Sequence, residues 1–398
     1  MKLLFSILFS AFFGTVAWAD WHTFRGPDAT GQNADARSFS VAEDSIVWAA
    51  DLPGEGVGSP VIVGDRLYVS ASSGPHQDQL HVLCFSVADG SLLWERQFWA
   101  TGRVMHHKKT AVAAPSLVTD GARIFAHFSS NDLLCLDLEG NLEWLRGLTL
   151  DYPNASNSLG LASSPAMAGD VLIVQVENDS QSFAAGIDSK TGINLWKVDR
   201  TKKANWSSPV IYAGTDGKPI VVLQGSAGLD AVDPRTGDPV WSFENGASTS
   251  TSTAVGSDGR LYVPSNGLTV LQPGEASVPA TVWLSDQLSP GTSSPVVRGG
   301  LVYVVTRSSI LTSASTEDGE RLWRLRLQGP ISSSPVIAGR NLYVVSENGL
   351  LQQVDLDAPE GEVVGTLDLA ETILATPALS HGSIFLRSDH KLWRIGKP

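Results

Sequence analysis

Positive charge is scarce in this sequence. Its 398 residues contain 28 Lys and Arg against 41 Asp and Glu, which gives a formal net charge of −13. Binding to the phosphate backbone of a nucleic acid requires a net positive surface. We therefore expect no nucleic-acid partner.

Several enzyme motifs are also missing. The sequence has no Gly-x-Ser-x-Gly motif at a strand-to-helix turn and no Gly-rich phosphate loop before a helix. No carboxylate pair can be selected for hydrolysis, because most Asp and Glu residues fall in hairpin turns. The sequence therefore favours a binding module over an enzyme.

Long helical patterns are lacking as well. Glycine is abundant at 38 residues, proline stands at 21, and hydrophobic residues make up 42% of the chain. This composition is typical of an all-β protein with many turns and a sizeable core.

The first residues have the pattern of a secretory signal peptide. Lys2 precedes the apolar run Leu3–Phe13, and Ala17-Trp18-Ala19 is a small-x-small cleavage site. The run is too short for a membrane-spanning helix. Because Asp20, and not Cys, follows the expected cut after Ala19, we expect no lipid anchor. A periplasmic or secreted protein is predicted, and we expect a monomer.

A repeat of about 40 to 55 residues fills the rest of the chain, and it is clearest between Ser293 and Trp323. Each copy begins with a small residue followed by Pro or Ala and continues through four short strands. These starts stand at Ser59-Pro60, Ala114-Pro115, Ser164-Pro165, Ser208-Pro209, Thr253-Ala254, Ser294-Pro295, Ser334-Pro335 and Thr376-Pro377. The period is that of propeller blades.

The last strand of most copies carries tryptophan after an x-Gly turn. These residues are Trp94, Trp144, Trp196, Trp241, Trp283 and Trp323. Eight first strands but only seven last strands follow one another, and the missing one matches the lone strand around Trp48. The sequence thus predicts an eight-bladed β-propeller with four-stranded antiparallel blades, closed into a ring by the N-terminal strand. The domains are a signal peptide over 1–19, an extended N-terminal lead-in over 20–45, and the propeller over 46–398.

Two cysteines are present, Cys84 and Cys135, and both stand in the same strand of successive repeats. Equivalent side chains of neighbouring blades point the same way around a ring. We therefore expect two free, buried thiols and no disulfide.

The repeat SSPVV…GLVYVV…GERLW resembles the PQQ-like, quinoprotein-type β-propeller repeat, and the opening Trp21–Pro27 resembles that of secreted bacterial proteins of this group. Some relatives are dehydrogenases that hold pyrroloquinoline quinone (PQQ) and calcium and carry an adjacent Cys-Cys pair, which this chain lacks. Others, of the BamB type, are non-catalytic scaffolds of outer-membrane assembly. The resemblance implies the propeller fold, and we expect no cofactor.

Three long connections between blades are the candidate site. We expect them on one face, around the central opening, where they form a basic and amide-rich sector that binds an anionic ligand or an acidic partner segment. The candidate residues are Arg103, His106, His107, Lys108, Lys109, Tyr152, Asn154, Asn157, Arg200, Lys203, Asn205 and Trp206. A metal at His106-His107 is not expected, because no third ligand has a suitable spacing.

The leading hypothesis is a periplasmic or secreted, non-catalytic propeller that binds proteins or cell-envelope components. One alternative is a PQQ-dependent oxidoreductase with quinone and calcium at the ring centre. Another is a carbohydrate-binding propeller, for which the only support is Tyr152 and Trp206 near the opening.

Overall fold

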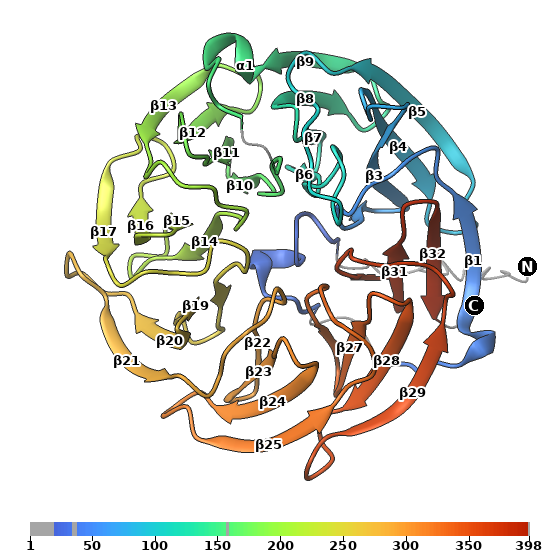
Figure 1. The fold of residues 1–398 in the computed structure, drawn as a ribbon, viewed down its shortest axis with the longest axis vertical. Helices are drawn as coiled ribbons and strands as arrows, with labels where there is room; N and C mark the ends of the chain where they lie inside the picture. Colours follow the sequence, from blue (N-terminus) through green and yellow to red (C-terminus); the bar gives the residue numbers. More distant parts are fainter. Residues whose placement is uncertain (1–19, 34–37, 157–158, 397–398) are drawn as a thin grey trace, which may run out of the picture.

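The structure is a computed structural model that describes residues 20–33, 38–156 and 159–396. In this part of the chain, eight four-stranded antiparallel sheets are arranged around a ring (Figure 1). The predicted eight-bladed propeller is therefore confirmed. The predicted signal peptide, residues 1–19, lies outside the described residues.

Seven blades are formed by four consecutive strands each. Blades one to four consist of β2 Val61–Val63, β3 Arg66–Ser73, β4 Gln79–Ser86 and β5 Leu92–Trp99; β6 Val118–Thr119, β7 Arg123–His127, β8 Asp132–Asp137 and β9 Leu142–Gly147; β10 Ala166–Ala168, β11 Val171–Val176, β12 Phe183–Asp188 and β13 Asn194–Asp199; β14 Val210–Ala213, β15 Pro219–Gly225, β16 Gly228–Val232 and β17 Pro239–Phe243. Blades five to seven consist of β18 Ala254–Val255, β19 Leu261–Ser265, β20 Gly267–Gln272 and β21 Ala280–Ser285; β22 Val296–Arg298, β23 Leu301–Val305, β24 Ile310–Ser315 and β25 Arg321–Arg326; β26 Val336–Ala338, β27 Asn341–Val345, β28 Leu350–Asp355 and β29 Glu362–Asp368. The described helical segments are η1 Pro27–Ala29, η2 Glu43–Ser45 and α1 Leu148–Asp151.

Blade eight joins the two ends of the chain. Its strands are β30 Ala378–Ser380, β31 Ser383–Arg387, β32 Lys391–Gly396 and β1 Ile46–Asp51. β1 pairs antiparallel with β32, so that Trp48 lies opposite Arg394. The N-terminal strand around Trp48 closes the ring as predicted, and this pairing removes two open sheet edges.

The period-two pattern of each strand serves two neighbouring blades. In β3, Leu67 and Val69 belong to the apolar cluster shared with blade eight, while Tyr68 belongs to the cluster shared with blade two. Strands that are buried on both faces read as nearly continuous apolar runs. The core is therefore a series of layers between blades.

Repeated tryptophans join six of the eight described blades to the next blade. Trp48 is 9% exposed and donates its indole N–H to the carbonyl of Val87, at 2.9 Å. A Cβ added to Gly90 would lie 2.6 Å from the Trp48 ring. Glycine is required there both by this contact and by its φ of 73°. The same ring-on-glycine contact pairs Gly140 with Trp94, Gly192 with Trp144, Gly237 with Trp196, Gly319 with Trp283 and Gly361 with Trp323.

The repeat starts need a correction in two blades. The residue two positions before the first strand is Ser116 in blade two and Ser252 in blade five, as their strands begin at Val118 and Ala254. The sequence alignment on Ala114-Pro115 and Thr253-Ala254 is therefore displaced by two residues and by one. Pro115 precedes the small residue in blade two, whereas proline follows it in most blades.

Both cysteines are free and buried, as predicted. Burial is the main cause that raises the pKa of the Cys84 thiol, to about 12, and burial also raises the pKa of Cys135. The two thiols therefore stay protonated at neutral pH.

The lead-in crosses one face of the ring (Figure 1). Trp21 exchanges backbone hydrogen bonds with Ile62 in blade one, both at 3.0 Å. Gln32 bridges to Ile337 in blade seven, and Phe39 stacks on Tyr343 with ring centroids 5.3 Å apart. The lead-in thus spans the ring before it enters β1.

No helix in the described ranges is both long and apolar enough to cross a membrane.

Replacing Trp48 with Ala should lower the free energy of unfolding by about 3–5 kcal/mol, because it removes a buried ring and an indole hydrogen bond at the closing seam. Denaturant titration measures this change. Trp99→Ala is the matched control, since Trp99 is 66% exposed and its loss should cost less than about 1 kcal/mol. Equal effects of the two changes would contradict the role of Trp48 in closure.

His127 gives the fold an acid sensitivity. It is 1% exposed, and burial lowers its pKa to about 4. The unfolded chain binds a proton at His127 at a higher pH than the folded chain does. The contribution of neutral His127 to the free energy of unfolding is therefore complete above about pH 6.5. As the pH falls toward 4, up to about 3 kcal/mol of it is lost. His127→Leu should flatten unfolding free energy over this range, whereas His76→Gln, at an exposed site, should not.

Candidate functional site

A channel runs along the ring axis. Its volume is about 450 Å³, and hydroxyl-bearing and small side chains from all the blades line it. The lining residues are Phe24, Val57, His107, Lys109, Thr110, Ala114, Ser116, Leu159, Ala162, Ser164, Trp206, Ser208, Ser250, Ser252, Thr292, Ser294, Ser332, Ser334, Leu374 and Thr376.

A ring of hydroxyls forms the channel wall. Seven lining hydroxyls belong to the residue two positions before a first strand, and six of them accept the amide N–H of the equivalent residue in the preceding blade. These bonds run from Ser59 to Ser116 (2.8 Å), Ser116 to Ser164 (2.9 Å), Ser164 to Ser208 (3.0 Å), Ser208 to Ser252 (2.9 Å), Ser294 to Ser334 (3.0 Å) and Ser334 to Thr376 (2.9 Å). The repeated serines therefore link the innermost strands.

An ion pair spans the mouth of the channel. Lys109, from the connection between blades one and two, places its Nζ 2.9 and 2.8 Å from the carboxylate oxygens of Glu347, in the turn between β27 and β28. Ser332 also donates to Glu347, at 2.6 Å. Burial alone would raise the pKa of Glu347, but these hydrogen bonds outweigh it and bring the pKa below its usual value. The pair ties a loop of blade two to blade seven.

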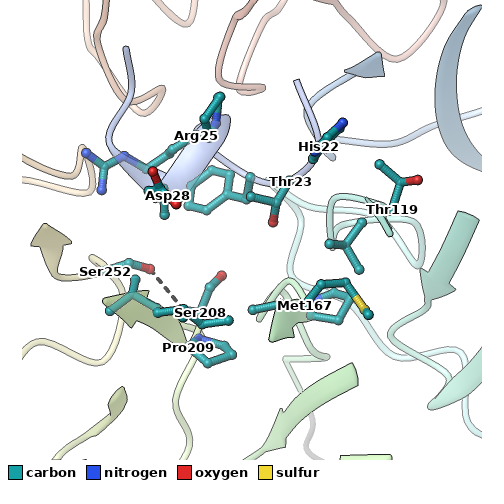
Figure 2. A pocket seen from close by; sticks show the side chains of 17 residues that line it. His22, Thr23, Arg25, Asp28, Thr119, Met167, Ser208, Pro209 and Ser252 are labelled. Carbon is teal, nitrogen blue, oxygen red and sulfur yellow. Dashed lines mark hydrogen bonds between the residues drawn. The ribbon is translucent and has the colours of Figure 1, made fainter. Parts of the chain in front are cut away.

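The lead-in covers the other end of the channel. Phe24 lines both the channel and a second cavity of about 250 Å³ that lies beneath it. Figure 2 shows this cavity, with His22, Thr23, Arg25 and Asp28 of the lead-in facing Met167 and Ser208 of the blades.

Arg25 anchors the lead-in. It is 1% exposed, and its guanidinium donates to the backbone carbonyls of Thr253 (3.4 Å) and Pro295. Burial lowers the pKa of Arg25 to about 9, so the group is still charged at neutral pH. A buried cation held by carbonyls of blades five and six fixes the segment over the ring.

The predicted site residues separate into three groups. His107, Lys109 and Trp206 reach the channel, and the Trp206 indole donates to the carbonyl of Gly160 at 3.0 Å. His106 lies beside them, with its Nδ1 3.2 Å from the carbonyl of His107.

A second group is engaged within the fold. Arg200 is bound to Glu177 at 2.7 Å and also to Asp230, and Asn205 is 1% exposed and donates to the carbonyl of Gln224 at 2.8 Å. Tyr152 packs in a tilted arrangement against Phe183 with ring centroids 4.3 Å apart, and its hydroxyl accepts from Asn194 at 2.9 Å. Tyr152 therefore lies beside the outer strand of blade three and not at the opening.

The third group is exposed. It comprises Arg103, Lys108, Lys203 and Asn154. Asn154 is not among the residues that line the channel, and its backbone N–H donates to the side-chain oxygen of Gln181 at 3.3 Å. Asn157 lies outside the described residues.

Sequence reasoning missed Phe24, Glu347 and the seven ring hydroxyls as channel residues. The Ser-Pro repeat is a visible signal for the hydroxyls, but it predicts only where the copies of the repeat begin. Nothing in the sequence links Glu347 to Lys109, since they are 238 residues apart.

The channel residues do not fit the calcium and quinone of the dehydrogenase relatives. Calcium takes six to eight oxygen ligands and favours carboxylates. Among the described residues that line the channel, the side-chain oxygens are hydroxyls and none is a carboxylate. The ammonium at its mouth, Lys109, is already paired with Glu347. In the described part of the chain, no three His, Cys, Asp or Glu side chains form a cluster suited to a metal.

A family model described as outer membrane protein assembly factor BamB matches residues 30–161, 154–272, 225–330 and 279–364. These overlapping matches cover most of the chain. The chain belongs to this family of PQQ-like propellers.

Two named relatives are similar in sequence. Outer membrane protein assembly factor BamB of Yersinia pestis is 26% identical over 273 residues, which are 64% of this chain and 60% of the relative. The protein of the same name from Alkalilimnicola ehrlichii is 26% identical over 187 residues, 46% of this chain and 42% of the relative. The alignments thus span 60% or less of these relatives.

Solved structures share the fold. BamB from Moraxella catarrhalis has a TM-score of 0.67 at 18% identity, covering 88% of this chain and 97% of that one. Quinohemoprotein alcohol dehydrogenase from Comamonas testosteroni has a TM-score of 0.69 at 12% identity, covering 96% and 81%. At such identities the likeness concerns the propeller fold alone.

Replacing Arg25 with Ala should release the lead-in from blades five and six, because the carbonyls of Thr253 and Pro295 lose their buried donor. Limited proteolysis measures this as faster cleavage within residues 20–33 of the folded protein. Arg103→Ala, at an exposed arginine, is the control and should leave the cleavage rate unchanged. An unchanged rate in Arg25→Ala would show that Arg25 does not hold the segment.

Proposed function

We propose that this protein is a scaffold of the cell envelope that binds another protein through its loop face, as a member of the BamB-like family. The supporting observation is a surface of exposed apolar and cationic side chains on the connections of blades two to four. We call it the loop patch. It consists of Met105, Leu150, Leu159, Arg103, Lys108 and Lys203.

Exposure of the apolar members favours a protein partner. Met105 is 42% exposed, Leu159 43% and Leu150 76%. Large apolar side chains grouped at one place on a surface are typical of interaction sites. Met105 and Leu159 lie in the same part of the loop face, because Ser129 donates to the Met105 carbonyl at 2.6 Å and accepts from the Leu161 amide, beside Leu159, at 2.8 Å.

Charge favours an acidic partner. The chain as a whole has a net charge of −13, but Arg103, Lys108 and Lys203 are exposed, and no ion pair of theirs occurs in the described part of the chain. An electropositive area on an acidic protein selects a complementary segment and speeds its association. The proposed partner is therefore a protein segment with acidic and apolar residues.

The proposed location is the periplasm or the exterior of the cell. The signal-peptide pattern of residues 1–19 and the family of the chain support it. We further propose that the partner takes part in outer-membrane protein assembly, as the names of the relatives suggest.

The combined change Arg103→Glu, Lys108→Glu and Lys203→Glu should reduce partner binding at least tenfold, because like charges then face the acidic segment. Affinity purification from envelope extracts, with quantitative mass spectrometry of outer-membrane assembly proteins, measures it. The matched control reverses Lys190, Lys218 and Arg235, which stand in turns on the opposite face. If both triple variants retain the same assembly proteins, the loop patch is not the binding surface.

A further inference from the structure

Blade one contains a hydrogen-bonded relay of serine, histidine and carboxylate. The Oγ of Ser73 is 2.7 Å from Nε2 of His81, and Nδ1 of His81 is 2.6 Å from Oε1 of Glu95. The three side chains come from β3, β4 and β5. Partner binding does not use them, and they lie apart from the channel.

The register of the sheet explains how they meet. Ser73 is paired with Gln79, Ala71 with His81, and Leu83 with Glu95. Diagonal neighbours on adjacent strands lie on one face and within reach of long side chains. The relay therefore runs across three strands of a rigid sheet.

The carboxylate sets the tautomer of the histidine. Glu95 accepts the Nδ1 proton of His81 and is itself held by Gln97, whose amide donates to the same oxygen at 3.0 Å. The other nitrogen, Nε2, then presents a lone pair to the Ser73 hydroxyl at 2.7 Å, closer than the Gln79 Oε1 that the same hydroxyl also contacts at 3.1 Å. A hydroxyl bonded to an imidazole that is oriented by a carboxylate is the arrangement that activates a serine nucleophile.

Burial divides the relay into a protected and an accessible part. His81 is 2% exposed and the Glu95 side chain is 24% exposed, whereas Ser73 is half-buried at the rim of the loop face. The amide of Gly74, which follows Ser73, makes no hydrogen bond within the described residues, so it can donate to an oxyanion. Acyl transfer requires a base that is protected from water and a hydroxyl that the substrate can reach.

An apolar surface adjoins the serine. Ser73, Gln79 and Trp99 stand in one row across β3, β4 and β5, and the Trp99 side chain is 66% exposed. Two strand spacings place Trp99 about 10 Å from Ser73. This distance suits an ester whose carbonyl lies at Ser73 while its apolar acyl or aryl group rests on the indole.

We propose that Ser73 is the nucleophile of an esterase site, with His81 as general base and Glu95 as its positioning residue, that cleaves esters with an apolar acyl or aryl group. The Ser73 oxygen forms a bond to the ester carbonyl carbon, and its proton moves to Nε2 of His81. The ester C–O bond breaks, and the alcohol leaves with that proton. Water then hydrolyses the acyl-serine, again through His81, and restores the hydroxyl.

A fluorophosphonate probe tests the nucleophile directly on the whole folded protein. Ser73 adds to phosphorus, fluoride leaves, and peptide mass spectrometry locates the adduct. We expect an adduct at Ser73 that forms at least about 100-fold more slowly in His81→Asn and about 10-fold more slowly in Glu95→Gln. Ser86→Ala, at a half-buried serine at the other end of the same hairpin, should keep the wild-type rate.

Two results would overturn the proposal: no adduct at Ser73 in the folded protein, or an adduct that forms at the same rate in the near-isosteric Glu95→Gln. That variant keeps the test valid if His81→Asn does not fold.

Hydrolysis of p-nitrophenyl butyrate tests the substrate class. Ser73→Ala should lower kcat/KM at least about 100-fold, and Trp99→Ala should raise KM several-fold with kcat unchanged. An unchanged KM in Trp99→Ala would overturn the assignment of Trp99 as the apolar surface. Hydrolysis that survives in Ser73→Ala would overturn the site itself.

Discussion

The contact between an outer-strand tryptophan and the x-Gly turn of the next blade is the interaction on which the rest of the structure depends. It sets the angle between neighbouring sheets, because the ring rests where any other residue would carry a Cβ. The closing seam uses the same contact: Trp48 lies on Gly90 just as Trp94 lies on Gly140. The ring is thus closed by the same geometry that separates most of its blades. Among the described residues, six of the eight seams have this contact; at the other two, the Trp241 indole donates to Tyr212 instead, and β29 Glu362–Asp368 of blade seven has no tryptophan.

Much of this architecture could be predicted from the sequence. Repeated Ser-Pro starts, x-Gly turns and tryptophans gave the number of blades, and the count of last strands gave the closure through β1 Ile46–Asp51. The copy predicted between Ser293 and Trp323 indeed contains β22 Val296–Arg298, β23 Leu301–Val305, β24 Ile310–Ser315 and the start of β25 Arg321–Arg326. The path of the lead-in could not be predicted, because Arg25 is held by backbone carbonyls of blades five and six. Every residue has a backbone carbonyl, so the sequence does not indicate which ones accept from Arg25.

The candidate site was predictable only in outline. The three connections were recognised as polar, but polarity does not distinguish an exposed cation such as Lys203 from Arg200, which is neutralised by Glu177 in another strand. The partners of Lys109 and Ser73 likewise depend on ring geometry and on sheet register. A histidine, a serine and a glutamate separated by 8 and 14 residues have no meaning until hairpins place them side by side.

The pairing of β1 with β32 has a consequence for how the chain folds as it is made. The Asp51 carboxylate meets the Lys391 ammonium across 340 residues, so the first strand is synthesised long before its partner. At ordinary rates of translation this interval is on the order of 20–70 s. During that time β1 is an unpaired edge whose side chains alternate between exposed and covered positions. The ring can therefore close only after β32 has been synthesised, and the stability that closure adds to the ring arises at that point.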